Sequence, residues 1–390
     1  MEKTSDILTR ASLGDPVALT QAMVSIPSVN PGLERAGAGE EGMARQAGAW
    51  LRGWGFETDL IEVAPGRWNV VGRWGEGGKC LILNGHLDTV GVTDMEIPPY
   101  SGDLRDGKVW GRGACDMKGG LAIILATAAA LSRNTTVGQL VVALTADEEH
   151  ASIGMQTFAK ALDGADAAVV CEPTSLAVMP AHKGFLWVDA DFRGRAAHGS
   201  RPEEGVDAIR HAGHFLAALE GLEARILQGV PHPLLGFPSF HAGTIEGGSA
   251  PSVYPASCNL VMERRTLPGE DPGTVLAEFQ KVMDQVVAEV PGVDVTLKPG
   301  LFRPGTEVEV DSPLVQGLLG AIEREGKEPA VEAMTAWVDA AFLNEAGIPA
   351  VCFGPGSIAQ AHAATEWVAV DELRDGARIL TRFAGDFLVD

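Results

Sequence analysis

Residues 80–88 read Cys80-Leu-Ile-Leu-Asn-Gly-His-Leu-Asp88, a short apolar run that ends in a histidine and an aspartate. An apolar run of this length is typical of a strand that is buried on both faces of a sheet. Ligands of open α/β sheets bind at the carboxyl ends of such strands. The stretch therefore predicts a buried strand that brings His86 and Asp88 to a functional edge.

Three later runs repeat this arrangement of an apolar strand followed by groups that bind metals. They are residues 139–145 before Asp147, Glu148 and Glu149, residues 167–171 before Glu172, and residues 349–353 before His362. Helical patterns lie between and after the runs, at residues 117–132, 311–325, 332–346 and 371–388. The alternation predicts an α/β fold with a central, mostly parallel sheet and helices on both faces.

The middle of the chain has a different pattern. Residues 185–192 alternate like a strand with one exposed face, residues 206–219 form an amphipathic helical pattern, and residues 258–262 read as another strand. We expect an inserted α+β domain over residues 181–298, which acts as a lid or dimerisation domain. The zinc-binding catalytic domain would then consist of two parts, residues 1–180 and 299–390.

Length and composition limit the class of protein. A chain of 390 residues with 46% hydrophobic and 21% charged residues is typical of a packed protein with about two domains. The formal charge of -22 disfavours nucleic acid and anionic lipid as partners. The purest apolar stretch, residues 121–131, is short for a membrane span, and residues 1–16 lack the apolar core of a signal peptide. We therefore expect a cytoplasmic location.

The residues that follow the predicted strands form a set with the chemistry of a metal centre. The five cysteines include no C-x-x-C pair, so a metal would bind to carboxylates and imidazoles. Two imidazoles and three carboxylates suit two divalent ions such as zinc, with one carboxylate bridging them and a water made nucleophilic. Asp116, ahead of a predicted helix, is the natural bridge. The whole set has two imidazoles and five carboxylates, which are His86, Asp88, Asp116, Glu148, Glu149, Glu172 and His362.

The same motifs resemble a known family over nearly the whole chain. The family comprises the di-zinc amidohydrolases and peptidases that include acetylornithine deacetylase, succinyl-diaminopimelate desuccinylase, aminoacylase and glutamate carboxypeptidase. The matching motifs include Asn84-Gly-His-Leu-Asp-Thr-Val, Gly111-Arg-Gly-Ala-Cys-Asp-Met-Lys-Gly-Gly, Thr145-Ala-Asp-Glu-Glu, Cys171-Glu-Pro-Thr, Ala197-His-Gly-Ser-Arg-Pro and His362-Ala-Ala-Thr-Glu-Trp-Val.

The resemblance implies a role for each member of the set. One Zn²⁺ would be held by His86, Glu172 and Asp116, and the other by Glu149, His362 and Asp116, with Co²⁺ able to substitute. Glu148 would be the general base. Asp88 would orient His86 by accepting its second N–H.

The resemblance also implies roles in the inserted domain and a homodimer. His198 would reach the site of the neighbouring subunit and hydrogen-bond the developing oxyanion. Arg265 would bind a substrate carboxylate through its planar, two-pronged guanidinium. Ser252 stands where the family usually has asparagine, so this chain departs from the pattern at a substrate-binding position.

Together these features predict a hydrolase that cleaves the amide bond of an N-acyl amino acid. A carboxypeptidase or dipeptidase of the glutamate carboxypeptidase type is the alternative within the same chemistry. A metal-binding protein without catalysis would have no use for Glu148 as a free base. A metal-free carboxylate-pair glycosidase would leave His86 and His362 without a role.

Overall fold

The computed structural model describes residues 4–133 and 138–389, so the outer ends of the expected catalytic segments, residues 1–3 and 390, lie outside the described residues. The chain divides into two compact units. The first comprises Met1–Pro180, Val308–Glu332 and Val338–Asp390, and the second Ala181–Glu307 with Ala333–Trp337. The second unit continues beyond residue 298, the expected boundary, because strand β12 (Asp294–Arg303) pairs with β9 (Gly184–Arg193) as far as Arg303.

The first unit is organised around a mixed sheet that is parallel at its centre. Strand β3 pairs in parallel with β6 and β7, and β15 pairs in parallel with β7, whereas β1, β2 and β8 join antiparallel. The expected α/β fold around a central sheet is thus confirmed, with the parallel pairs at the centre of the sheet and antiparallel pairs toward its edges. The order is β1 (Glu57–Ala64), β2 (Arg67–Trp74), β6 (Gln139–Thr145), β3 (Cys80–His86), β7 (Ala167–Val170), β15 (Ala350–Cys352) and β8 (Val178–His182).

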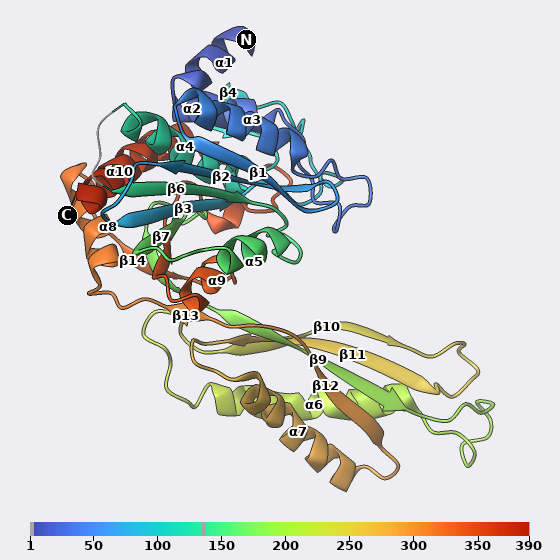
Figure 1. Ribbon diagram of the computed structural model, residues 1–390. Helices are drawn as coiled ribbons and strands as arrows, with labels where there is room; N and C mark the ends of the chain where they lie inside the picture. Colours follow the sequence, from blue (N-terminus) through green and yellow to red (C-terminus); the bar gives the residue numbers. More distant parts are fainter. Residues whose placement is uncertain (1–3, 134–137, 390) are drawn as a thin grey trace. The chain divides into compact units, whose positions relative to one another are not determined.

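Helices cover both faces of this sheet, as expected (Figure 1). Helices α4 and α10 pack against each other on one face, and α5 and α9 contact strands of the sheet and each other on the other. The bounds are α1 (Thr4–Ser12), α2 (Pro16–Val24), α3 (Glu41–Gly53), α4 (Gly119–Leu131), α5 (Ile153–Lys160), α8 (Pro313–Arg324), α9 (Ala340–Glu345) and α10 (Val370–Val389). A separate small sheet joins β16 (Trp367–Ala369), β5 (Lys108–Trp110) and β4 (Asp103–Arg105).

Helix α4 is a core helix. Residues Ala114–Leu131 are long and apolar enough to span a membrane by length and composition, yet 94% of this window is buried inside the protein. A helix that is hydrophobic all round is expected at such a buried position. The helix begins at Gly119, because Asp116 and Met117 have non-helical backbone angles. Asp116 therefore precedes the helix and does not cap it.

One predicted helix is wrong in its first half. Residues 332–346 were expected to be helical throughout, but Val331–Met334 forms strand β14, which pairs with β8, and α9 begins only at Ala340. The pairing with β8 is a long-range contact that competes with the local helical pattern. Tertiary context has therefore overridden local propensity here.

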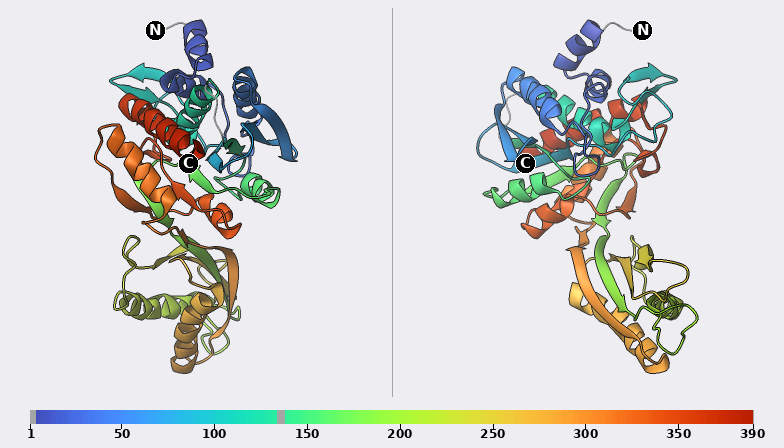
Figure 2. Two further views of the ribbon diagram at one scale, coloured as in Figure 1. Left: turned by 60° about the vertical axis from the view of Figure 1, so that its left-hand side comes forward. Right: turned by 90° about the vertical axis from the view of Figure 1, so that its right-hand side faces the viewer.

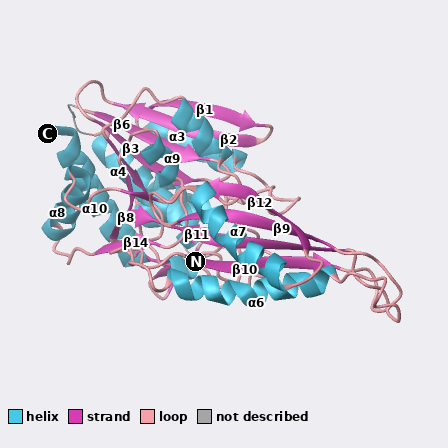
Figure 3. Cartoon of the chain, turned by 90° about the horizontal axis from the view of Figure 1, so that it is seen from below, coloured by secondary structure: helices cyan, strands magenta, loops and turns pink. Residues whose placement is uncertain are grey.

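The second unit has a sheet with helices on one face. Its strands follow the order β10 (Ser239–Gly247), β11 (Ser257–Thr266), β9 and β12, as Figure 3 shows. Helices α6 (Ala208–Ile226) and α7 (Pro272–Glu289) lie together against this sheet (Figure 2). Alternate residues of β9, including Leu186, Val188 and Ala190, are buried in that core, which confirms the predicted alternation. Strand β13 (Thr306–Glu307) pairs with Ala181 and His182.

Candidate metal centre and active site

Three neighbouring strands deliver acidic and imidazole groups to one edge of the central sheet. His86 is the last residue of β3 and lies opposite Thr145, the last residue of β6. Glu148 and Glu149 follow β6 by a few residues, and Glu172 follows β7. Because parallel strands end at the same edge, these side chains meet although they are far apart in the sequence.

Asp116 lies between the two histidines that were predicted as ligands. Its Oδ1 atom is 3.1 Å from Nε2 of His86, and its Oδ2 atom is 3.4 Å from Nε2 of His362. His362 Nε2 also lies 3.0 Å from Oε2 of Glu149. Potential ligand atoms of His86, Asp116 and Glu149 all lie within 4.8 Å of one another. Each oxygen of Asp116 thus contacts a different imidazole, which is the arrangement a bridging carboxylate needs.

Two carboxylate oxygens at this edge have no hydrogen-bond partner. Oε1 of Glu149 and Oε1 of Glu172 are both buried and unpaired among the described residues. A buried carboxylate oxygen without a donor is costly unless a cation or a proton compensates for it. Carboxylates and imidazoles are also the donor types that zinc accepts. The residues present therefore fit a site for divalent ions.

The pKa directions show that the site favours positive charge. Hydrogen bonds to Asp116 and Glu149 raise the pKa of His362 to about 10. Burial, with the charges of Asp116 and Asp339, raises the pKa of Glu172 to about 8, although His86 acts in the opposite direction. Burial opposes ionisation of Asp116, but hydrogen bonds from His362 and His86 outweigh it and hold the pKa of this carboxyl well below its usual range. The carboxyl groups of this site outnumber the positively charged groups that contact them.

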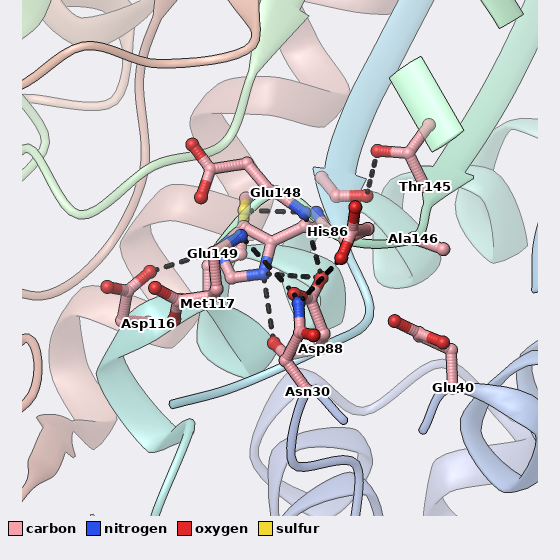
Figure 4. Close-up of polar contacts among 12 residues, drawn as sticks. Asn30, Glu40, His86, Asp88, Asp116, Met117, Thr145, Ala146, Glu148 and Glu149 are labelled. Carbon is pink, nitrogen blue, oxygen red and sulfur yellow. Dashed lines mark hydrogen bonds and ion pairs between the residues drawn. The ribbon is translucent and has the colours of Figure 1, made fainter. Parts of the chain in front are cut away.

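Glu148 differs from Glu149 in its surroundings. Among the described residues its side chain makes no hydrogen bond or ion pair with an imidazole, whereas Glu149 lies 3.0 Å from Nε2 of His362. Burial and the charge of Glu172 raise the pKa of Glu148 well above its usual range, and Asp339 contributes in the same direction. Figure 4 shows Glu148 beside His86, with Glu149 nearer to Asp116. Such a carboxyl is a candidate acid or base.

Asp88 acts differently from the sequence-based expectation. The backbone carbonyl of Asp88, at 2.9 Å, is the nearest acceptor for Nδ1 of His86, while the Asp88 carboxylate is 3.7 Å from that nitrogen. The carboxylate instead accepts the backbone N–H groups of Glu148 and Glu149, each at 3.2 Å. A short H-x-D spacing allows either geometry, so the sequence could not distinguish them.

Glu366 is a structural partner of the site that sequence reasoning missed. Its buried carboxylate accepts the backbone N–H groups of Gly113, Cys115 and Asp116 and a bond from Nη1 of Arg112. These contacts hold the segment that presents Asp116. The sequence did place Glu366 in the motif that begins at His362. Nothing in that motif, however, indicated that the Glu366 side chain contacts a loop 250 residues earlier.

The remaining predicted residues belong to the second unit. His198 is exposed, with Nδ1 2.8 Å from the Ser200 hydroxyl, and the next residue, Gly199, donates its N–H to the carbonyl of Ser252 at 2.7 Å. His198 and Ser252 are thus on adjoining segments. Arg265 lies on β11, where its Nε donates to Glu263 and its guanidinium lies over the ring of Phe185.

Comparison with known proteins relates the chain to metal-dependent hydrolases. The model for peptidase family M20/M25/M40 matches residues 82–386. The chain is 33% identical over 324 residues to acetylornithine deacetylase of Myxococcus xanthus, which covers 82% of this chain and 83% of that protein. It is 29% identical over 364 residues to acetylornithine deacetylase of Vibrio atlanticus, covering 92% and 94%.

Solved structures share the fold at lower identity. An M20 family metallo-carboxypeptidase from Sulfolobus solfataricus aligns with a TM-score of 0.78 at 17% identity, covering 96% of this chain and all of that one. A dinuclear metal binding peptidase of the M20 family from Bacillus subtilis aligns with a TM-score of 0.73 at 17% identity, covering 97% and 99%. At these identities the likeness concerns the fold.

Proposed function

Since the chain belongs to peptidase family M20/M25/M40, we propose that this hydrolase removes the acyl group from an N-acyl amino acid, as an acetylornithine deacetylase or succinyl-diaminopimelate desuccinylase does. One observation carries the proposal. Asp116 lies between His86 and His362, with unpaired oxygens of Glu149 and Glu172 beside it and a separate carboxyl, Glu148, next to them. These residues would bind metal ions, and Glu148 would remain free to act as a base.

The ligand assignment follows the contacts. His86, Glu172 and Asp116 would hold one Zn²⁺, and Glu149, His362 and Asp116 would hold the other, with Co²⁺ as a substitute. Divalent ions bound there would lower the pKa of a water molecule and polarise the amide carbonyl. Positive charge between these groups would also offset the effects of burial and of charge repulsion, which together raise the pKa values of Glu148 and Glu172.

Glu148 is the proposed general base. Its carboxylate takes a proton from the attacking water and delivers it to the nitrogen of the leaving amine. Asp88 supports this role by fixing the backbone of residues 148 and 149 through its two carboxylate oxygens. The base is thereby held on a rigid turn next to the ligands.

The second unit supplies the proposed contacts to substrate. His198 would donate a hydrogen bond to the oxyanion in the active site of the partner subunit of a homodimer, as in the family that the sequence resembles. Arg265 would bind the free carboxylate of the amino acid, and Ser252 would hydrogen-bond the substrate. The exposed position of His198 is compatible with a contact outside its own unit.

The alternative is a carboxypeptidase or dipeptidase that uses the same centre. The names of the structural relatives include peptidases, whereas the sequence relatives quoted above are deacetylases at higher identity. The deacylase is therefore preferred. We also place the protein in the cytoplasm, with a small-molecule substrate and neither nucleic acid nor membrane as a partner.

A substrate panel tests the proposal. N-acetyl-L-ornithine, N-succinyl-diaminopimelate and ornithine-containing dipeptides would be compared at equal concentration with zinc-loaded protein. We expect the N-acyl amino acids to give the higher kcat/KM, and a chelator to abolish the activity until zinc is returned. Faster hydrolysis of the dipeptides would instead assign the chain to the peptidase alternative.

A further inference from the structure

A chain of buried polar contacts leads away from the turn that carries Glu148 and Glu149. It begins at Asp88, whose Oδ1 accepts the N–H of Glu148 and whose Oδ2 accepts the N–H of Glu149. Asp88 is completely buried. Its carboxylate therefore fixes the backbone of two adjacent residues, and its own position is set by whatever contacts its remaining lone pairs.

Asn30 joins Asp88 to Asp147. Its Nδ2 group donates to Oδ2 of Asp88 at 2.7 Å and to Oδ1 of Asp147 at 3.0 Å. Figure 4 shows Asn30 directly below Asp88. Asp147 precedes Glu148 and has a φ angle of 72°, a left-handed conformation that residues other than glycine seldom adopt and that aspartate tolerates better than most.

Arg67 completes the chain of contacts. Its Nη2 atom is 2.9 Å from Oδ1 of Asp147, and its Nε donates to Oε2 of Glu40 at 2.8 Å. The side chain of Arg67 is 11% exposed and that of Glu40 is fully buried. Arg67 begins β2 and Glu40 directly precedes α3, so the guanidinium connects the turn to two regular elements.

The charges explain why the contacts of Arg67 with Glu40 and Asp147 matter. Asp88, Asp147 and Glu40 are three buried carboxylates, and the guanidinium of Arg67 contacts two of them. Removing a cation from such a group leaves buried charge uncompensated. Asp147 would then be repelled by its acidic neighbours, and the turn that it precedes would lose its support.

We propose that Arg67 is a positioning residue of the active site, which fixes Glu148 and Glu149 through Asp147, Asn30 and Asp88. The inference rests on the proposed function, because it takes Glu148 as the base and Glu149 as a metal ligand. Residues that support metal ligands in this way typically change affinity or activity by about 10–100-fold when they are lost.

The geometry also explains the choice of arginine at this position. One planar guanidinium reaches two carboxylates at fixed angles, with Nε and Nη2 on one side toward Glu40 and Nη2 also within reach of Asp147. A lysine ammonium keeps the charge but cannot hold both partners in this geometry. The variant Arg67→Lys therefore keeps the positive charge but loses the positioning of the two carboxylates, so its effect reports on positioning alone.

The test compares Arg67→Lys with two controls on the same strand. Val70→Ala removes buried volume from β2 without touching the contact chain, and so reports loss of stability alone. Arg73→Lys alters an arginine whose partner, Asp59, is at the exposed surface. For each variant we would measure kcat and KM for N-acetyl-L-ornithine, zinc affinity by competition with a chelator, and the thermal midpoint.

We expect Arg67→Lys to lose roughly 10-fold or more in kcat with KM changed less than about twofold, and to bind zinc more weakly. Val70→Ala should keep the kcat and the zinc affinity of the wild type, even if its thermal midpoint falls as far as that of Arg67→Lys. If Arg67→Lys matches Val70→Ala in kcat and in zinc affinity, Arg67 is only structural and the proposal is wrong.

A second variant, Asn30→Ala, and the zinc affinities test the role of Arg67 even if Arg67→Lys does not fold or the protein has another substrate. If Arg67→Lys does not fold, Asn30→Ala breaks the same chain of contacts without removing a charged group, and near-wild-type kcat and zinc affinity for that variant would overturn the proposal. If the wild-type protein does not hydrolyse N-acyl amino acids, the proposed function fails, but the zinc affinities of the same variants still decide the role of Arg67.

Discussion

Glu148 and Glu149 are adjacent in the chain, yet their side chains have separate surroundings. Oε2 of Glu149 lies 3.0 Å from Nε2 of His362, whereas the Glu148 side chain makes no hydrogen bond or ion pair with an imidazole among the described residues. We predict that Glu148→Gln keeps its metal content and loses about 100-fold or more in kcat, because the amide preserves shape but cannot accept the proton. Glu149→Gln should instead weaken metal binding. Elemental analysis beside steady-state kinetics checks both, and an active Glu148→Gln protein would exclude Glu148 as the base.

His182 gives the protein a predicted dependence of stability on pH. Burial lowers the pKa of His182 to about 4, and its ring fits the neutral form, with Nδ1 near the Lys183 carbonyl and Nε2 near the Thr306 hydroxyl. In the unfolded chain its pKa is about 6.5, so between these values the unfolded state binds more protons. The stability that neutral His182 allows is therefore fully present above about pH 6.5 and is lost as the pH falls toward 4.

The measurement compares wild type with His182→Gln in denaturant titrations at pH 7.5 and pH 5. Wild type should lose about 2 kcal/mol more unfolding free energy between these two pH values than the variant, because only wild type gains a proton at residue 182 on unfolding. Equal losses in the two proteins would show that His182 titrates normally in the folded state.

At the scale of elements, helix α10 packs against α4 in the core of the first unit. Phe383 on α10 is almost completely buried in the core cluster that also contains Leu125 of α4. We predict that Phe383→Ala lowers the unfolding free energy by about 3–5 kcal/mol, because it removes buried apolar surface and leaves a cavity. Urea denaturation followed by circular dichroism checks this value. Arg374→Ala, on an exposed position of the same helix, is the control and should change the free energy by less than about 0.5 kcal/mol.

The elements that the sequence predicted correctly are those whose patterns are local. Strands β3, β6, β7 and β15 are short apolar runs that end in polar groups, and this pattern is visible without knowing the partners. Strand β14 was missed because its pairing with β8 is not encoded in its own residues. A long-range pairing of this kind cannot be obtained from periodicity.

The candidate site also has parts that the sequence could predict and parts that it could not. Most of its candidate ligands could be chosen from residue type and position after a strand, and Asp116 from its position ahead of a helix. The structure brings His86, Asp116, Glu149 and His362 together. The supporting contacts could not be chosen, because Arg67 and Glu40 are 27 residues apart and neither belongs to a motif of the metal set. Buried ion pairs between distant segments are visible only in the folded chain.

At the scale of the whole molecule, the proposed homodimer makes a quantitative prediction. Inactive Glu148→Gln and inactive His198→Ala proteins would be mixed under conditions that exchange subunits. If His198 serves the partner subunit, one of the two sites in each mixed dimer regains both residues, so activity should recover to about a quarter of wild type. Native mass spectrometry reports the mixed dimers. Mixed dimers that stay inactive, or a monomeric mass, would contradict the shared site.

If Asp116 bridges two metal ions, as we propose, anomalous diffraction at the zinc edge from crystals grown with zinc would locate both of them. We predict two peaks about 3.5–4 Å apart, one beside His86 and Glu172 and the other beside Glu149 and His362, each next to one oxygen of Asp116. A single peak at excess zinc, with one oxygen of Asp116 left without a metal, would show that Asp116 does not bridge two ions.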